Sequence, residues 1–164
     1  MKHLIRTTLF LVLFCSVYII NAQTKNTFLE RAFWKTNPTI AQVEQKIKEG
    51  NSATTLNRSG FDAVVYALLE NADAKVIKHL LSKKGNNVNK LTHDGRTYIF
   101  WASYKNNITI VKYLLKNGAK TGVIDDKGYS VVNFTANAGV KNTKLYDLLI
   151  KHGVDIRKDK TPKG

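Results

Sequence analysis

The sequence predicts an all-α fold in which one helix–turn–helix unit is repeated along the chain. Four glycines, Gly50, Gly85, Gly118 and Gly153, recur at intervals of 35, 33 and 35 residues. Between them, apolar side chains fall at i, i+3 and i+4, which places them on one buried stripe of a helix. A period of this length indicates a solenoid whose units bury their apolar faces against one another.

A second set of glycines divides each unit. Gly60, Gly95 and Gly128 each lie ten residues after one of the first three periodic glycines. Because glycine adopts positive φ angles without steric cost, the two sets predict a helix end and a tight turn in every unit. The segments between paired glycines are polar and are predicted to be exposed loops: residues 51–59, 86–94 and 119–127.

The first 22 residues have the layout of a secretory signal peptide. Lys2 and Arg6 precede an apolar run over residues 9–20, and a small-residue cleavage site precedes Gln23. The apolar run is shorter than the ~20 residues that span a bilayer; an uncleaved N-terminal anchor is the alternative interpretation. The chain is therefore predicted to be secreted or periplasmic, with a signal peptide over residues 1–22.

Cysteine content and charge limit the chemistry of the mature chain. Cys15 is the only cysteine, and cleavage would leave no disulfide, no cysteine metal ligand and no thiol nucleophile. The full chain carries a net charge of +14; without Lys2 and Arg6, 24 basic and 12 acidic residues leave +12. Such a charge favours nucleic acid, an anionic membrane surface or an acidic protein as partner classes.

Residues 28–50 are predicted to form an N-terminal partial unit. Apolar residues between Phe28 and Phe33 lie at helical spacing. A second helix is expected to begin near Pro38, because proline is well tolerated at the first helical position and Asn37 can cap the helix. Gly50 would end it.

Three full units follow, over residues 60–85, 95–118 and 128–153, and each is expected to contain two helices. Residues 158–164 are expected to be a C-terminal tail or the start of a further unit, since Gly164 lies eleven residues after Gly153. Unless a tail, a partner or a second copy covers the last unit, three of its apolar side chains are expected to be partly exposed: Phe134, Leu145 and Leu148.

The order of these features resembles the ankyrin repeat, whose period is ~33 residues. After Gly95 and Gly128 come a Thr or Ser two residues on, an apolar stretch with Ala, and a Leu-Leu pair before the next glycine. The resemblance covers roughly residues 28–157. It implies an ankyrin-repeat domain over residues 23–157, with about three full repeats, one partial repeat, and loops that project as β-turn fingers.

The sequence departs from the family at its Thr-Pro-Leu-His tetrapeptide. The three units read Asp62-Ala63-Val64-Val65, Thr97-Tyr98-Ile99-Phe100 and Ser130-Val131-Val132-Asn133. No unit has the histidine that helps to tie neighbouring ankyrin repeats through hydrogen bonds. That polar network is therefore expected to be missing, with apolar packing through Val65 and Phe100 in its place and weak coupling between units.

No catalytic or metal-binding set is evident in the mature sequence. His79, His93 and His152 belong to different units and lack an i, i+4 partner, so they are interpreted as solvated or helix-end histidines. Asp125 and Asp126 are interpreted as a turn, with Asp125 as its cap. There is no glycine-rich phosphate loop. The protein is not expected to be an enzyme or to hold a cofactor or metal.

The resemblance instead implies a module that binds a protein partner through a concave face of fingers and first helices. The contact positions carried over from the family are Phe61, His93, Asp94, Arg96, Tyr104, Lys105, Asp126, Lys127 and Tyr129, with Arg58, Ser59, Leu69, Glu70, Asn137 and Ala138 as further positions. Phe61, Arg96, Tyr104 and Tyr129 are expected to anchor the partner, because aromatic residues and arginine dominate interface energies.

Two further patterns concern other partners. Tyr66, Trp101 and Phe134 each lie six residues after a finger glycine, and the repeated core is favoured over a base-stacking platform for them.

Many lysines lie on the second helices and their exits: Lys46, Lys48, Lys75, Lys78, Lys83, Lys84, Lys112, Lys116, Lys141, Lys144 and Lys151. Lysine without arginine is typical of a solvated face, so nucleic acid is not expected. Adhesion to an anionic surface through this convex back, or a role as the targeting segment of a larger protein, are the alternative functions.

Overall fold

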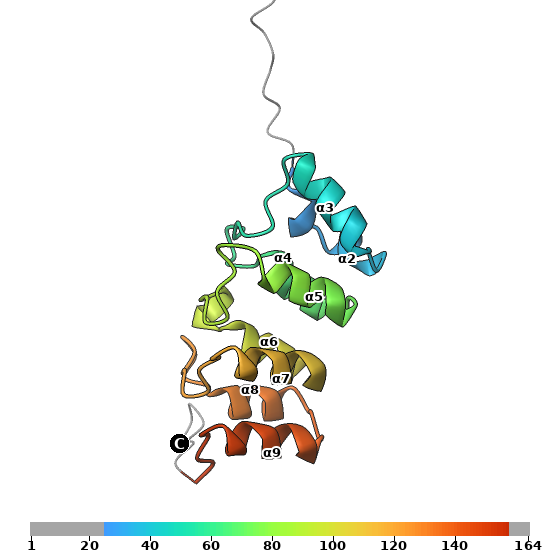
Figure 1. Ribbon diagram of the computed structural model, residues 1–164. Helices are drawn as coiled ribbons and strands as arrows, with labels where there is room; N and C mark the ends of the chain where they lie inside the picture. Colours follow the sequence, from blue (N-terminus) through green and yellow to red (C-terminus); the bar gives the residue numbers. More distant parts are fainter. Residues whose placement is uncertain (1–24, 158–164) are drawn as a thin grey trace, which may run out of the picture.

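The computed structural model describes residues 25–157, which form a stack of helical hairpins (Figure 1). The predicted signal peptide over residues 1–22 and the tail over residues 158–164 lie outside the described residues. The expected all-α solenoid is confirmed. Its regular elements are helices, and the described residues contain one isolated β-bridge, between Ile124 and Ser130.

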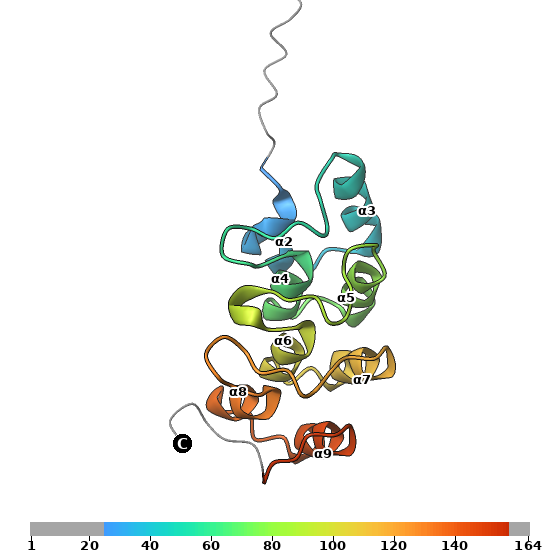
Figure 2. The same ribbon diagram turned by 90° about the vertical axis from the view of Figure 1, so that its left-hand side faces the viewer.

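Four hairpins follow one another along the chain. They pair α2 (Arg31–Lys35) with α3 (Ile40–Lys48), α4 (Ala63–Leu69) with α5 (Ala74–Leu81), α6 (Tyr98–Tyr104) with α7 (Ile108–Lys116), and α8 (Val131–Asn137) with α9 (Thr143–Lys151). Figure 2 shows α4, α6 and α8 in one column and α3, α5, α7 and α9 in a second column beside it. The hairpins correspond to the predicted partial unit and the three full units.

The N-terminal hairpin differs from its prediction in two details. A 3₁₀ helix, η1 (Thr27–Leu29), and α2 replace the single first helix, because Glu30 between them is extended, with φ −108° and ψ 120°. The second helix begins at Ile40, not at Pro38. Thr39 and Gln42 form a reciprocal capping box there, and this satisfies the first free backbone amides of α3.

The turn between the two helices of each hairpin contains a left-handed residue. Asn37, Asn71 and Asn106 have φ angles of 50°, 56° and 52°, and Gly139 has φ 77°. Asparagine tolerates this region better than other residues with a side chain. These four residues therefore allow the chain to reverse between the paired helices.

The core runs continuously through the stack. Leu80, Leu114 and Leu149 on successive second helices are completely buried. Leu145 is completely buried as well, because it belongs to the continuous apolar core, so the expectation that it is partly exposed was wrong. Phe134 and Leu148 are half-buried, as expected. Near the last hairpin, three large apolar side chains are exposed by 57%, 40% and 53% respectively: Ile124, Ile150 and Ile156.

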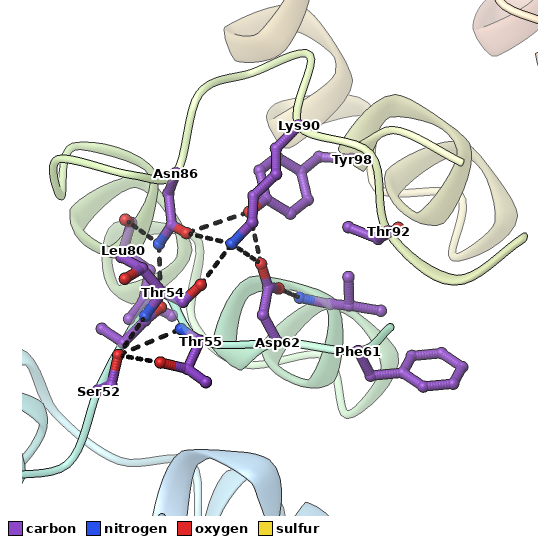
Figure 3. Close-up of polar contacts among 12 residues, drawn as sticks. Ser52, Thr54, Thr55, Phe61, Asp62, Leu80, Asn86, Lys90, Thr92 and Tyr98 are labelled. Carbon is purple, nitrogen blue, oxygen red and sulfur yellow. Dashed lines mark hydrogen bonds and ion pairs between the residues drawn. The ribbon is translucent and has the colours of Figure 1, made fainter. Parts of the chain in front are cut away.

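A buried polar cluster couples the first two full repeats (Figure 3). The Lys90 ammonium donates to the backbone oxygen of Thr54 at 2.6 Å and forms an ion pair with Asp62 at 2.8 Å. The Tyr98 hydroxyl donates to the same carboxylate oxygen of Asp62 at 2.7 Å. Asn86 adds its amide to the cluster, 3.2 Å from the ammonium.

This cluster corrects the expectation that coupling between units is purely apolar. Asp62 and Tyr98 are completely buried, and burial, followed by the neighbouring Asp62, raises the pKa of the Tyr98 phenol. Asp62 also caps α4 by accepting from the amide of Val65 at 3.0 Å. The family's network is nevertheless absent at Thr97, whose hydroxyl is buried without a hydrogen-bond partner, since Phe100 stands at the histidine position.

Candidate protein-binding face

Three fingers project from the column of α4, α6 and α8 on the side away from the second helices (Figure 2). They are tight turns over residues 57–61, 92–96 and 125–129. In each, the first residue exchanges backbone hydrogen bonds across the turn, as in the 2.8 Å bond from the Asn57 amide to the Phe61 oxygen. Gly60, Gly95 and Gly128 have φ angles of 78°, 69° and 81°, which confirms the turns that the sequence predicts there.

The side chain at the start of each finger fixes the turn. The Asp125 carboxylate accepts from the amides of Lys127 and Tyr129 at 2.9 and 2.8 Å. Asn57 accepts in the same way from Phe61 at 3.0 Å. In the middle finger the Thr92 hydroxyl donates to the backbone oxygen of Arg96 at 2.6 Å. The interpretation of Asp125 as a turn cap is confirmed.

Neighbouring fingers are joined through their main chains. The His93 amide donates to the Gly60 oxygen at 2.8 Å, and the Asp126 amide donates to the Asp94 oxygen at 2.9 Å. Asp94 adopts a left-handed conformation, with φ 56°. The three fingers therefore form one connected edge of the stack.

Aromatic rings line the surface between the fingers and the first helices. We call the surface made by the three fingers and the exposed sides of α4, α6 and α8 the finger face. Its ring-bearing residues are Phe61, Tyr66, His93, Tyr104, Tyr129 and Phe134, and the buried Trp101 ring contacts three of them. The Phe61 ring stacks on His93 and Tyr66 at centroid distances of 4.5 and 5.5 Å. The Phe134 ring lies 5.7 Å from Trp101 and 5.6 Å from Tyr104.

The prediction that Tyr66, Trp101 and Phe134 belong to the core holds for one of them. Trp101 is 5% exposed, and its indole N–H donates to the Thr92 hydroxyl at 2.8 Å. Tyr66 and Phe134 are half-buried and contribute to the finger face. Sequence spacing places all three at equivalent positions, but it does not reveal how much each neighbouring finger covers them.

Arg96 does not lie on the surface as a free anchor, contrary to expectation. It is 7% exposed, and its Nε donates to the Asp125 carboxylate at 2.7 Å. Its guanidinium lies over the Phe134 ring, 4.2 Å from the centroid, and is 5.4 Å from that of Trp101. Because its charge and its planar surfaces are already engaged inside the protein, Arg96 supports the finger face rather than offering a contact.

Of the other principal contact positions, Phe61, His93, Asp94, Asp126, Lys127 and Tyr129 belong to the fingers, and Tyr104 and Lys105 lie at the C-terminal end of α6. Tyr104 is 40% exposed, and Asp126 and Lys127 are exposed at the tip of the last finger. The remaining positions are half-buried: Phe61, His93, Asp94, Lys105 and Tyr129. Carboxylates and ammonium groups alternate here, with the Lys127 ammonium 4.0 Å from Asp94. The face thus combines aromatic surface with charges of both signs.

The histidines have local partners. His79 contacts the Glu44 carboxylate at 2.6 Å, so it bridges two helices rather than being simply solvated. His152 lies at the end of α9, as expected, and its Nδ1 is 2.8 Å from the Leu148 oxygen. Within residues 25–157, no group of three or more His, Cys, Asp or Glu side chains is placed to hold a metal ion. No helix in this part of the chain is long and apolar enough to cross a membrane.

Comparison with protein families agrees with this architecture. A model of ankyrin repeats (3 copies) matches residues 29–125. The chain belongs to the ankyrin-repeat family. The ankyrin match ends at the start of the third finger, whereas α8 and α9 continue the same hairpin plan beyond it. Comparison with curated proteins gave no match. Ankyrin repeats are generally protein–protein interaction modules, and the family is typically non-catalytic.

Proposed function

We propose that this ankyrin-repeat protein binds a protein partner through its finger face. The observation that carries the proposal is the continuous row of rings from Tyr66 to Tyr104, flanked by charged finger tips. Aromatic side chains lose little conformational entropy on binding and dominate the energy of interfaces. Here the rings are already held in place by their neighbours, so a partner would meet a preorganised surface.

Tyr104 and Asp126 are the residues on which the partner would depend most. Tyr104 is 40% exposed, and one side of its ring is supported by Phe134. The exposed Asp126 carboxylate forms no hydrogen bond or ion pair with the residues that the structure describes. Both side chains can therefore be removed with little cost to the fold. Arg96 is unsuitable for such a test, because its removal would leave the buried Asp125 without its ion-pair partner.

The test compares two double variants as baits in affinity capture from the envelope fraction of the source organism. Tyr104→Ala with Asp126→Ala alters the finger face. Ile150→Ala with Glu49→Ala is the matched control, since Ile150 is also 40% exposed but lies on α9, and the exposed Glu49 follows α3. The same retained protein should bind the wild type and the control and lose at least tenfold in affinity for the finger-face variant, with unchanged helix content. Equal capture by both variants would remove the finger-face assignment.

We also propose that the protein is secreted or periplasmic. The support is the sequence of residues 1–22, in which a basic start, a short apolar run and a small-residue site precede Gln23. The intact mass of the protein recovered from outside the cytoplasm should correspond to a chain that begins at Gln23. A mass that includes residues 1–22 would indicate an uncleaved anchor instead.

A further inference from the structure

The second helices present a basic surface on the side opposite the finger face. Helices α3, α5, α7 and α9 lie in a single column (Figure 2). We call this column and its exits the back. All eleven lysines that the sequence places on second helices and their exits belong to it, whereas its acidic residues are four: Glu44, Glu49, Asp73 and Asp147. The back therefore has a positive potential that the finger face lacks.

Within the N-terminal half of the back, several lysines are engaged inside the protein. Lys46 pairs with Glu49 at 2.7 Å. Lys83 pairs with Glu44, and hydrogen bonds from Lys83 and His79 lower the pKa of that carboxyl. The Lys78 ammonium lies 5.6 Å from the centroid of the Tyr113 ring. Lys48, Lys75 and Lys84 are exposed on the same half.

The C-terminal half of the back is different. Its five lysines are all exposed, and none forms an ion pair or a cation–π contact with another described residue: Lys112, Lys116, Lys141, Lys144 and Lys151. Asp147 is the single acidic residue among them in this half of the back. Four positive charges therefore remain uncompensated over α7, α9 and their adjoining turns.

Three of these lysines line an open groove between α7 and α9. The groove has a volume of about 440 Å³ and is lined by Ile108, Lys112, Lys144, Asp147, Leu148 and Lys151. Ile108 and Leu148 are half-buried and give it an apolar floor. We call these six residues the lysine groove. Cationic side chains around an apolar strip are the arrangement with which peripheral proteins contact a lipid surface.

We propose that the lysine groove docks this protein on a bilayer that contains anionic lipids. The lysine ammonium groups would lie at the headgroups, and their alkyl stems, with Ile108 and Leu148, would face the boundary with the acyl chains. A lipid surface fits better than a nucleic acid for two reasons. The patch has no arginine for bidentate phosphate contacts. Its nearby tyrosines are also engaged: Tyr146 donates to the Val140 oxygen, and Tyr113 lies beneath Lys78.

This docking would leave the finger face free. The lysine groove lies on the second-helix column and the fingers project from the opposite side of the first-helix column (Figure 2). Membrane attachment and partner binding would then use separate surfaces, and neither depends on the other. The protein could hold its partner at a lipid surface without competition between the two contacts.

The test measures partition of the secreted chain, which is proposed to begin at Gln23, onto vesicles of phosphatidylcholine with and without about 30% phosphatidylglycerol. Each lysine near an anionic surface strengthens partition by roughly fivefold. The triple variant Lys112→Gln, Lys144→Gln and Lys151→Gln should therefore bind anionic vesicles about a hundredfold more weakly.

The matched control changes Lys48, Lys75 and Lys84 to Gln. It removes the same net charge from exposed lysines of the back, but these lie on or next to α3 and α5 and none of them lines the groove. Partition of the control should stay within a few-fold of wild type. Equal losses in both triples would overturn the assignment to the lysine groove. Should the groove triple unfold, Lys144→Gln alone should lose about fivefold.

Three measurements decide the nature of the partner. Wild-type binding should disappear on vesicles without phosphatidylglycerol and weaken steeply as salt rises. Partition that is equal on neutral vesicles would overturn the proposal. A 30-base-pair DNA duplex should bind more weakly than the anionic vesicles. Tighter binding to the duplex would assign the groove to nucleic acid and would also overturn it.

Discussion

The buried ion pair between Lys90 and Asp62 is expected to be one of the strongest single couplings between repeats. Lys90→Met removes the ammonium that contacts Asp62 at 2.8 Å and the Thr54 oxygen at 2.6 Å. The Asp62 side chain is 0% exposed, so the variant leaves a buried carboxylate without its countercharge. Breaking one side of such a pair lowers the free energy of unfolding by about 3–5 kcal/mol.

A double-mutant cycle isolates this interaction from the loss of the lysine stem. In Lys90→Met with Asp62→Asn no buried charge is left, and the amide oxygen of the new asparagine can still accept from the Val65 amide. The double variant should therefore recover about half of the loss. The single Asp62→Asn variant completes the cycle and should also lose stability, so the coupling free energy between the two sites should be at least ~2 kcal/mol. The exposed Lys75→Met is the matched control and should change stability by less than ~0.5 kcal/mol.

Urea unfolding followed by far-ultraviolet circular dichroism provides the assay. With an m-value of about 2 kcal/mol/M, the midpoint of Lys90→Met should fall by roughly 2 M. A loss below ~1 kcal/mol in Lys90→Met would show that water or a neighbouring group replaces the ammonium. Additive losses in the double variant would show that the two side chains do not interact. Either result would refute the reasoning.

Three other predictions follow from the same region and from the fingers. The pKa of Tyr98 is raised in the folded state, so its contribution to the free energy of unfolding is complete below pH ~10 and is lost above it, by up to ~1.4 kcal/mol per pH unit. In urea titrations between pH 10 and 11, Tyr98→Phe should therefore lose stability less steeply than wild type, and parallel slopes would contradict this. Gly60→Ala and Gly118→Ala should each lose about 1–2 kcal/mol of stability, because both place an alanine in the left-handed region. A Cβ at Gly60 would also lie 2.9 Å from the His93 backbone nitrogen, whereas a Cβ at Gly118 would have no heavy atom of a more distant described residue within 4 Å. Gly60→Ala should therefore have the lower midpoint, and equal midpoints would show that the finger yields freely. Thr97→Val should raise the unfolding free energy by about 1 kcal/mol, because it removes a buried hydroxyl without a partner; a decrease in thermal stability would indicate that the hydroxyl is satisfied in solution.

The fold could be predicted because its signals are local and repeated. Paired glycines gave the finger turns and the helix ends, and leucine spacing gave the buried side of each second helix. One local signal was overlooked. Thr39 and Gln42 match the capping-box pattern, which would have placed the start of α3 correctly.

The coupling between repeats could not be predicted in the same way. Lys90 and Tyr98 lie 28 and 36 residues after Asp62 in the sequence. Each of the three residues alone resembles an ordinary surface or core residue. Their side chains come into contact only when successive repeats pack against each other. The same limit applies to Arg96. The family pattern identifies its position in the finger, but Asp125 and the Phe134 ring, which engage its guanidinium, come from the following repeat.

The hydrogen bonds from the His93 amide to Gly60 and from the Asp126 amide to Asp94 have a consequence for how this molecule can change. Both join backbone atoms only, so the alignment of successive turns is independent of most side chains at their tips. Substitutions at Ser59, Lys127 or Tyr129 can then alter what is recognised while the scaffold keeps its geometry. Diversification of specificity, whether by natural variation or in a library, is therefore best concentrated at those tips.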